Sequence, residues 1–364
     1  MHTINLISVP EKHSLWVSPI DKPEFQKLLR SRGIDISSNA PSAKWDMVNC
    51  SEYDGWKVGG ISEDRPTILL DLRDAASTDS VLVTYLNQSN VKICIRPNTY
   101  VPRSIDNEKH HDLLYWADRL LTKIPPEHEP WPNIIDREPL GEIALNKIQT
   151  ISNIAWGHGY ENCKWFNDEP PRGKPIDIFS LGCMNSYWTR LVRYHRRLCL
   201  DAIKSLPDYY IKCIGASTTT KDPIRINDGW HHMPGSGEFF RLLQNSKVVV
   251  SPYGYGEMSF KDWEAVMSAT VIIKPHMDHV EINPSPYSDF NTVYCEPDFS
   301  DLANVAKNVL KNWGSFQEST LHWRNVWLDR ISTYDYLVDI WDKTLSPILN
   351  SETKGVGHWK TRTD

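Results

Sequence analysis

Short apolar runs alternate with longer amphipathic stretches along the second half of this chain. The apolar runs are rich in β-branched residues, which is typical of strands buried in a parallel sheet, and the amphipathic stretches have the spacing of surface helices. In chain order the pattern predicts strand 176–181, helix 187–205, strand 209–214, helix 237–244 and strand 248–250. This order predicts a doubly wound α/β domain over residues 176–330, with ligands binding at the carboxyl ends of the strands.

The first half repeats the same rhythm less clearly. Strand 67–71, helix 80–87 and strand 91–96 form a βαβ pattern, and a further helix is predicted over 110–121. We therefore expect an N-terminal Rossmann-like domain over residues 1–155. Proline-rich composition predicts an irregular linker at about 125–175.

Two more helical patterns follow the second domain, at 301–313 and 332–345. The chain has 364 residues, which is enough for two domains that each bury a hydrophobic core. Its net charge of -6 argues against a nucleic-acid partner, because such proteins usually carry a basic excess. The 15 tryptophans and 15 tyrosines fit sugar or base stacking for some rings and core packing for most.

Cysteine usage and the amino terminus suggest a cytoplasmic protein. The seven cysteines are scattered, without a Cys-x-x-Cys pair, as expected of reduced and mostly buried thiols. The sequence shows no signal-peptide pattern and no apolar run long enough to span a membrane. We therefore expect no integral membrane segment.

The most informative stretch is 251–275, Ser-Pro-Tyr-Gly-Tyr-Gly-Glu-Met-Ser-Phe-Lys-Asp-Trp-Glu-Ala-Val-Met-Ser-Ala-Thr-Val-Ile-Ile-Lys-Pro. A strand leads into a turn at Gly254 and Gly256, a helix opens near Ser259, and a second strand ends at Lys274-Pro275. Free N–H groups at a helix start bind phosphate, and Lys261 would add positive charge. The same layout also fits a purely structural strand-to-helix turn.

This stretch resembles the donor-sugar motif of GT-B glycosyltransferases, particularly the exostosin-like and group 1 families. The resemblance is specific from Glu238 to His279 and rests on the glycine turn, Lys261 and the pair Glu264-Ala265. It implies a GT-B fold, with two Rossmann-like domains facing a cleft, and a final helix and tail over 331–364 that cross back to the first domain.

The resemblance also implies an activity and roles for residues. The protein would be a hexosyl-, deoxyhexosyl- or pentosyltransferase that moves a sugar from a UDP- or GDP-sugar to a glycan acceptor, in glycan or polysaccharide biosynthesis. Glu264 would hold the ribose hydroxyls, Lys261 the diphosphate, and Glu257 the hexose or the end of the phosphate loop. The donor site would comprise Gly254, Tyr255, Gly256, Ser259, Phe260, Lys261 and Glu264.

Basic residues on helix 187–205 are candidate partners of the same phosphates. In related transferases an arginine on this helix binds the donor, which makes Arg190 and Arg196 the candidates here. A solvated basic face is the alternative, and it fits Arg193 and Arg197 better.

Asp71 and Asp74 lie at the carboxyl end of the predicted strand 67–71, where a base that activates the acceptor would lie. Capping of the next helix and an ion pair with Arg73 are the alternatives. With Lys261 and Glu257, these two carboxylates complete the candidate catalytic set. No Asp-x-Asp or zinc-type spacing is present, so no metal or other cofactor is required by this interpretation.

A second class of function stays open. Six residues separate Glu257 from Glu264, one fewer than in retaining members of the family. A non-catalytic glycan- or nucleotide-binding protein of the same fold would tolerate this change.

Overall fold

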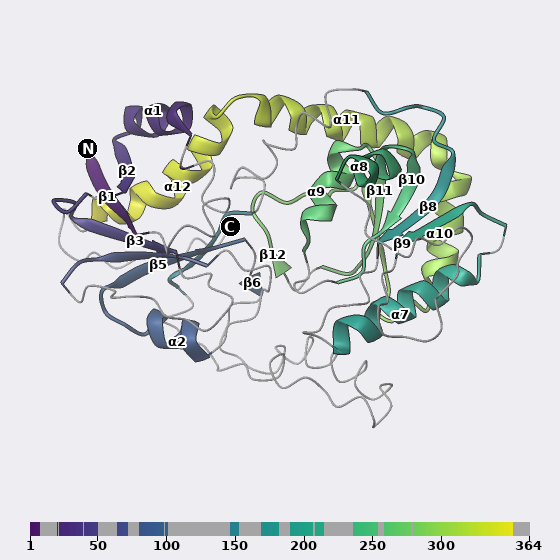
Figure 1. Ribbon diagram of the computed structural model, residues 1–364, viewed down its shortest axis with the longest axis horizontal. Coiled ribbons are helices and arrows are strands. Elements are labelled where there is room, and N and C mark those ends of the chain that lie inside the picture. The colour runs from purple at the N-terminus through teal and green to yellow at the C-terminus, as the bar shows by residue number, and fades with distance from the viewer. Residues whose placement is uncertain are drawn as a thin grey trace.

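The computed structural model describes residues 1–7, 20, 22–38, 40–49, 64–71, 80–97, 99–100, 146–152, 169–181, 190–206, 208–214, 236–253, 258–277 and 280–351. Two parallel sheets dominate these residues, one in each half of the chain (Figure 1). Both sheets carry helices on their faces, so the predicted α/β class is confirmed.

The N-terminal sheet has six parallel strands in the order β2-β1-β3-β4-β5-β7. The strands are β1 His2–Ile7, β2 Ile34–Ser38, β3 Trp45–Asn49, β4 Thr67–Leu70, β5 Val91–Arg96 and β7 Ile148–Thr150. Helix α1 (Pro23–Ser31) covers one face and α2 (Ser80–Leu86) the other. Gly33 ends the turn after α1 with φ +88°, a conformation that few residues other than glycine adopt, and the chain then enters β2 directly.

The C-terminal sheet has five parallel strands in the order β13-β11-β10-β8-β9. They are β8 Ile176–Leu181, β9 Ile211–Ile214, β10 Ser246–Val250, β11 Val271–Pro275 and β13 Thr292–Cys295. Helices α7 (Arg190–Lys204) and α10 (Leu302–Lys311) pack on one face of this sheet. Helices α8 (Ser236–Gln244), α9 (Phe260–Met267) and α11 (Trp313–Ser332) pack on the other.

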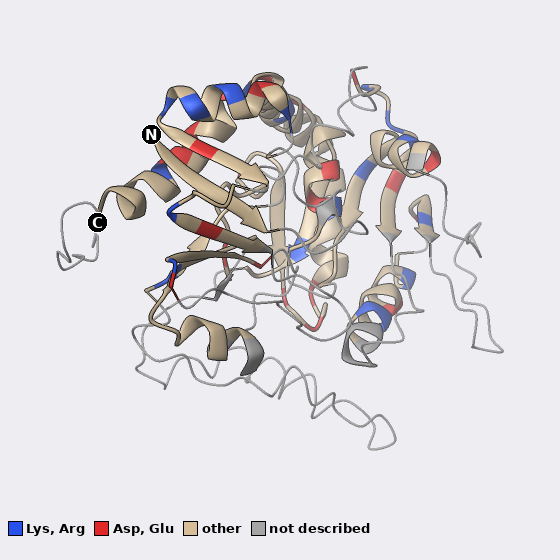
Figure 2. Ribbon diagram, turned by 60° about the vertical axis from the view of Figure 1, so that its left-hand side comes forward, with Lys and Arg blue, Asp and Glu red and all other residues tan. Residues whose placement is uncertain are grey.

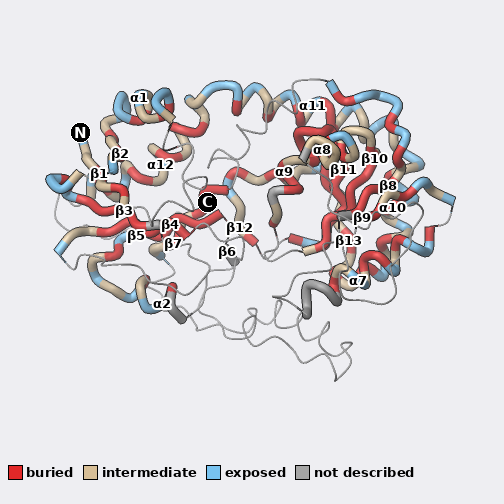
Figure 3. The backbone as a smooth tube through the Cα atoms, viewed as in Figure 1, coloured by how far each residue is buried: buried red, intermediate tan, exposed pale blue. Residues whose placement is uncertain are grey.

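Burial follows the apolar pattern of the sequence. Every residue of β4 and β11 is buried, as expected of strands covered on both faces, and Figure 3 shows such buried strands in both sheets. On α10 the buried residues Leu302, Ala306 and Val309 recur at helical spacing along one face. The hydrophobic effect on these faces therefore places each helix against its sheet.

Helix α12 (Asp335–Ser351) follows α11 and packs on the N-terminal sheet rather than on the sheet that precedes it in sequence. Its side chains Leu337, Val338, Trp341, Leu345 and Leu349 share a core with β1, β2 and α1. In the last turn of α11, the Arg330 guanidinium lies over the rings of Trp323, Trp327 and Tyr336, 4.9–5.8 Å from their centroids. These cation–π contacts fix the direction in which α12 leaves α11.

A second connection joins the two sheets. Strands β6 (Thr99–Tyr100) and β12 (Val280–Glu281) form a two-stranded antiparallel sheet that lies between the larger ones in Figure 1. The Thr150 hydroxyl donates to Glu281 Oε1 at 2.9 Å, and the Ser152 N–H donates to the Asn283 carbonyl at 2.7 Å. The C-terminal half thus contacts the carboxyl edge of the N-terminal sheet through residues 280–283.

Several predicted elements are confirmed and others need correction. Strands 91–96 and 176–181 have the predicted bounds, whereas helix 332–345 instead runs from Asp335 to Ser351. The stretch 125–175, expected to be irregular, contains the edge strand β7. The predicted helix 110–121 lies outside the described residues.

Replacing Trp341 by alanine is expected to destabilise the protein by about 3–5 kcal/mol, because it removes a fully buried indole from the contact between α12 and the N-terminal sheet. Urea unfolding followed by fluorescence measures the change. Lys343→Ala is the control on the same helix: this side chain is 78% exposed, and its loss should cost less than about 0.5 kcal/mol. Equal effects of the two substitutions would contradict the packing role of Trp341.

Candidate functional site

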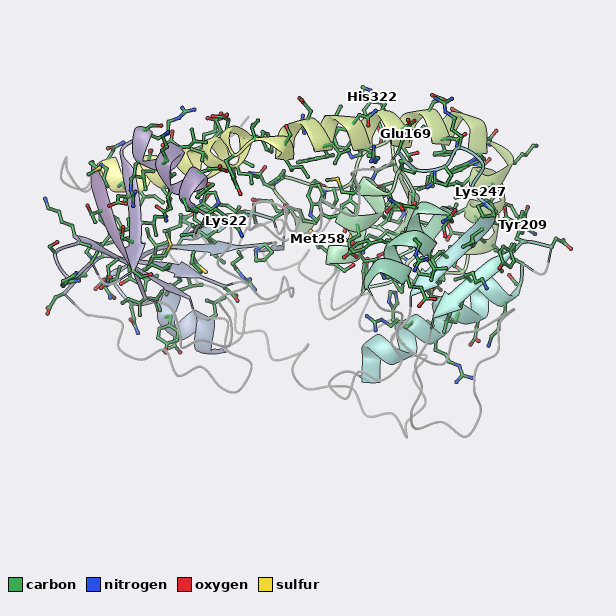
Figure 4. All side chains as sticks on the ribbon, turned by 45° about the horizontal axis from the view of Figure 1, so that its top comes forward. Lys22, Glu169, Tyr209, Lys247, Met258 and His322 are labelled. Carbon is green, nitrogen blue, oxygen red and sulfur yellow. The ribbon has the colours of Figure 1, made fainter. Side chains whose placement is uncertain are left out.

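The carboxyl ends of β10 and β11 meet the start of α9 at a buried cluster of polar side chains. Ser251 follows β10, Lys274 belongs to β11, and Asp262 lies in the first turn of α9. All three are fully buried, which is unusual for charged residues that lack a specific partner. Met258, labelled in Figure 4, precedes this helix on the side of the C-terminal half that faces the N-terminal half.

Asp262 is the centre of this cluster. Its carboxylate accepts hydrogen bonds from the Ser251 hydroxyl at 2.5 Å, the Ser259 N–H at 2.9 Å and the Tyr287 hydroxyl at 2.8 Å. The Lys274 ammonium lies 3.1 Å from the same carboxylate. Ser259 and Asp262 also form a capping box, which places the start of α9 where the sequence predicts it.

The charge of Asp262 is maintained by these neighbours. Burial alone would raise the pKa of this carboxyl, but Lys274, Lys261 and the hydrogen bonds from Ser251 and Ser259 lower it overall. The pKa of Tyr287 is raised well above its ordinary value by burial and by the Asp262 carboxylate, so its hydroxyl stays protonated and donates. Both ends of the segment between β10 and α9 are thereby bound to one carboxylate.

Lys261 and Arg196 add positive charge beside this network. Lys261 is buried, and burial lowers the pKa of its ammonium to about 8; Asp262 raises that pKa, and the charges of Arg196 and Lys274 lower it. Arg196 therefore lies near enough to act on Lys261, although the two residues come from α7 and α9. Figure 2 shows the basic positions along α7. Within the described residues, cations converge here from two helices and a strand.

Glu264 lies in the second turn of α9. Its side chain is half-buried, and burial raises the pKa of its carboxyl to about 7, with Lys261 opposing this shift and Asp262 adding to it. Near neutral pH the group thus exchanges a proton readily. Hydroxyl donors of a ligand would stabilise the ionised form of such a carboxyl and lower its pKa.

The C-terminal end of α9 is held by two cations. The buried Lys174 ammonium donates to the carbonyls of Ser268 and Ala269 and to the Thr270 hydroxyl at 2.9–3.1 Å. The Arg324 guanidinium of α11 donates to the Met267 carbonyl at 2.8 Å. Positive charge at a helix C-terminus satisfies its last carbonyls and complements its dipole. Helix α9 is therefore fixed at both ends.

His195 of α7 lies beside the cluster in a defined tautomer. Its ring is stacked on that of Tyr253, with centroids 4.9 Å apart, and packs at a tilt of 39° against that of Phe299, with centroids 4.7 Å apart. Nε2 lies 2.9 Å from the Pro297 carbonyl, which only accepts, so Nε2 carries the proton. Burial lowers the pKa of His195, the Pro297 bond opposes this shift, and Lys274 and Arg196 add to it, so that the pKa is about 3. The imidazole is therefore neutral and packs beside the buried polar cluster as an uncharged ring.

The structure brings Lys261, Glu264, Ser259 and Arg196 together at one edge of the C-terminal sheet. The backbones of Phe260 and Arg190 open α9 and α7, and their side chains are outside the described set. Gly254, Tyr255, Gly256 and Glu257 also lie outside the described residues, as does Asp74.

Asp71 differs from its expected role. The carboxylate has no exposed surface and lies 2.9 Å from the guanidinium of Arg96, which is also fully buried. Arg96 belongs to the adjacent strand β5, and Arg73 lies outside the described residues. This geometry gives an acceptor no access to Asp71 and does not support its use as a base. The ion pair instead joins the carboxyl ends of β4 and β5.

Asp262 and Tyr287 are the site residues that sequence reasoning missed. The spacing Ser259-x-x-Asp262 is a capping-box pattern and was a usable signal for Asp262. Nothing local marks Tyr287, which reaches Asp262 across 25 residues of sequence.

Metal-binding clusters and membrane-spanning helices are absent from the described residues. These residues contain no group of three or more His, Cys, Asp or Glu side chains that could hold a metal ion. No helix among them combines the length and the apolar character needed to cross a membrane. The four described cysteines, Cys94, Cys199, Cys213 and Cys295, are buried, as expected.

Comparison with known proteins identifies the fold of the chain. No protein-family model matches the chain, and no curated protein sequence does either. Among solved structures, a glycosyltransferase from Rickettsia africae ESF-5 is similar over 98% of this chain and 99% of that one, with 12% identity and a TM-score of 0.51. The chain has a GT-B fold. Alr3699/HepE of Anabaena, solved in complex with UDP, is similar over 95% of this chain and 100% of its own, with 10% identity and a TM-score of 0.48.

The predicted GT-B architecture, with two Rossmann-like domains, is thus confirmed. At these identities the likeness establishes the fold, and the chemistry has to be argued from the site itself.

Asp262→Asn is expected to lower the free energy of unfolding by about 3 kcal/mol or more, because it leaves the buried Lys274 ammonium without its counter-charge. Chemical denaturation measures the loss. The double variant Asp262→Asn/Lys274→Met removes both charges and should recover part of it. A double variant less stable than Asp262→Asn alone would contradict the pairing.

Glu264→Gln is expected to stabilise the unliganded protein at pH 8 by on the order of 2 kcal/mol and to have little effect at pH 4.5. The folded-state pKa is raised from 4.5 to about 7, so the folded chain binds the proton more tightly, and wild-type stability falls as the pH rises between these values. Thermal unfolding from pH 4.5 to 8 tests this. A gain in stability that is independent of pH would rule out the carboxyl as its source.

Proposed function

We propose that this protein is a glycosyltransferase that moves a sugar from a nucleotide-sugar donor, a UDP- or GDP-sugar, to a glycan acceptor. The observation that carries the proposal is the convergence of Lys261, Lys274 and Arg196 at the start of α9 and the carboxyl edge of the C-terminal sheet. Open α/β sheets bind ligands at this edge, and a diphosphate is the part of the donor that needs positive charge.

The charge balance supports an anionic ligand. Burial and the neighbouring cations oppose the charge of Lys261, which is why its pKa falls to about 8. Asp262 compensates part of this positive charge, and its hydrogen bonds are already taken by Ser251, Ser259 and Tyr287. A diphosphate would compensate the rest and would restore the ordinary basicity of Lys261.

In this proposal each residue contributes to departure of the nucleotide. Lys261, Arg196 and the N–H groups of the first turn of α9 stabilise the charge that grows on the diphosphate as the sugar bond breaks. Glu264 orients the donor by accepting from the ribose hydroxyls, and Arg190 and the segment Gly254–Glu257 remain predicted donor contacts. Asp74 remains the predicted base for the acceptor.

The fold supports the same reaction class. The Rickettsia protein is a glycosyltransferase, and its fold extends over nearly the whole of both chains. Membership of the exostosin-like or group 1 family, the class of sugar, a role in glycan biosynthesis and a cytoplasmic location all remain predictions of the sequence.

Lys261→Met tests the proposal. A panel of UDP- and GDP-sugars is screened by thermal shift and by donor hydrolysis on wild type and variant. One donor should raise the wild-type Tm and be hydrolysed slowly. The variant should lose at least tenfold in affinity for that donor, while its own Tm without ligand stays the same or rises, because a buried charge has been removed.

Lys247→Met is the matched control, since Lys247 pairs with Asp177 at the far end of β10 and should leave donor binding unchanged. If no nucleotide sugar shifts the wild-type Tm, the transferase proposal is wrong. Binding without hydrolysis or transfer to any glycan would favour the non-catalytic alternative.

A further inference from the structure

One short segment of the chain touches both the N-terminal half and the candidate donor site. At its start, Val280 and Glu281 pair with Tyr100 and Thr99 of β6, and Glu281 accepts from Thr150. At its end, Tyr287 donates to Asp262. Residues 280–287 thus span from the carboxyl edge of one sheet to the first turn of α9.

The end of this segment is rigidly held. The Trp323 indole N–H and the Asn291 amide both donate to the Pro286 carbonyl, at 3.2 and 3.1 Å, and the Tyr287 N–H donates to the Ser285 hydroxyl. The Tyr287 ring also lies 5.7 Å from the Lys274 ammonium, which contacts its face. The direction of the Tyr287 hydroxyl is therefore set by the backbone of this segment.

Asp262 transmits that direction to α9. The oxygen that accepts from Tyr287, Oδ2, also accepts from the Ser259 N–H, while Oδ1 accepts from Ser251. A carboxylate with three donors and one ammonium around it has little freedom to turn. Its position fixes the N-cap of α9, and with it the backbone from which the Lys261 side chain starts.

We propose that Tyr287 is a positioning residue of the donor site, which sets the first turn of α9 for the diphosphate and couples it to the contact between the two halves of the protein. This inference rests on the proposed function. It assigns to residues 280–287 a role in donor affinity, although none of them is among the proposed donor contacts.

The consequence is an energetic link between two separate places. Loosening the Thr150–Glu281 contact should weaken donor binding through Tyr287, and donor binding should in turn strengthen that contact, because coupling between sites is reciprocal. Continuity of contacts alone does not measure such a coupling. A double-mutant cycle does.

The test measures the Kd of UDP or GDP, whichever the wild type binds, by calorimetry. Tyr287→Phe keeps the ring and loses only the donation to Asp262, and it should raise the Kd about tenfold. Affinity for the corresponding nucleoside monophosphate should change much less, because it brings less negative charge to the first turn of α9. Thr150→Val should raise the diphosphate Kd about threefold, and it should have no further effect in the Tyr287→Phe background.

Ser246→Ala is the control for a purely structural effect. It removes one hydrogen bond, from the Ser246 hydroxyl to the Leu242 carbonyl, at the opposite end of β10, and should leave the Kd within twofold of wild type at a comparable loss of Tm. The inference is overturned if Tyr287→Phe binds the diphosphate as tightly as this control. It is also overturned if Thr150→Val and Tyr287→Phe act independently.

The two proposals fail in different ways. If the wild type binds no nucleoside diphosphate or nucleotide sugar, the proposed function itself fails. If the wild type binds and Tyr287→Phe binds equally well, only the positioning role of Tyr287 is lost.

Discussion

The buried ion pair between Asp262 and Lys274 is the interaction on which the C-terminal half of the structure depends. Neither side chain has exposed surface, so each charge is tolerable only because the other lies 3.1 Å away and hydrogen bonds satisfy the remaining oxygen lone pairs. The pair can form only when β11 and α9 are in place, and Ser251 and Tyr287 add β10 and the segment after β12. Such a contact contributes more to the uniqueness of the arrangement than to net stability.

Helix α9 carries this constraint to the rest of the molecule. Lys174 and Arg324 bind its last carbonyls, and Arg324 belongs to α11, which continues into α12 on the N-terminal sheet. The short helix that presents Lys261 and Glu264 is thus fixed at its start by the sheet below it and at its end by the helix that leads to the other half. Apolar packing alone would leave it free to slide or rotate by small amounts; directional bonds at both ends do not.

Patterns with a local cause could be predicted from the sequence. The strands 91–96 and 176–181, the helix start at Ser259 and the α/β class follow from apolar runs and capping chemistry within a few residues. Strands β1, β2 and β3 did not give a clear pattern, and β7 is a three-residue edge strand in a proline-rich stretch. The pairing of Asp71 with Arg96, and of Tyr287 with Asp262, depends on which strands become neighbours, which no local pattern encodes. The proposed donor-site residues on α9 could be named from the sequence because they lie close together in it, whereas the side chains that support them come from distant segments.

The electrostatics of the site support the proposed binding function. A purely structural turn would be more stable with neutral side chains or with charges that are fully paired. Here, however, burial lowers the pKa of Lys261 to about 8 and raises that of Glu264 to about 7. Without a ligand, the charged ammonium of Lys261 and the charged carboxylate of Glu264 therefore each lower the stability of the folded protein. Lys174, which is equally buried, has a different explanation, since its three hydrogen bonds close the end of α9. In the proposed function, a ligand that brings an anion to Lys261 and hydroxyl donors to Glu264 would favour the ionised form of each. A diphosphate joined to a ribose offers both groups within one molecule, which is why the site fits a sugar nucleotide better than a simple phosphate.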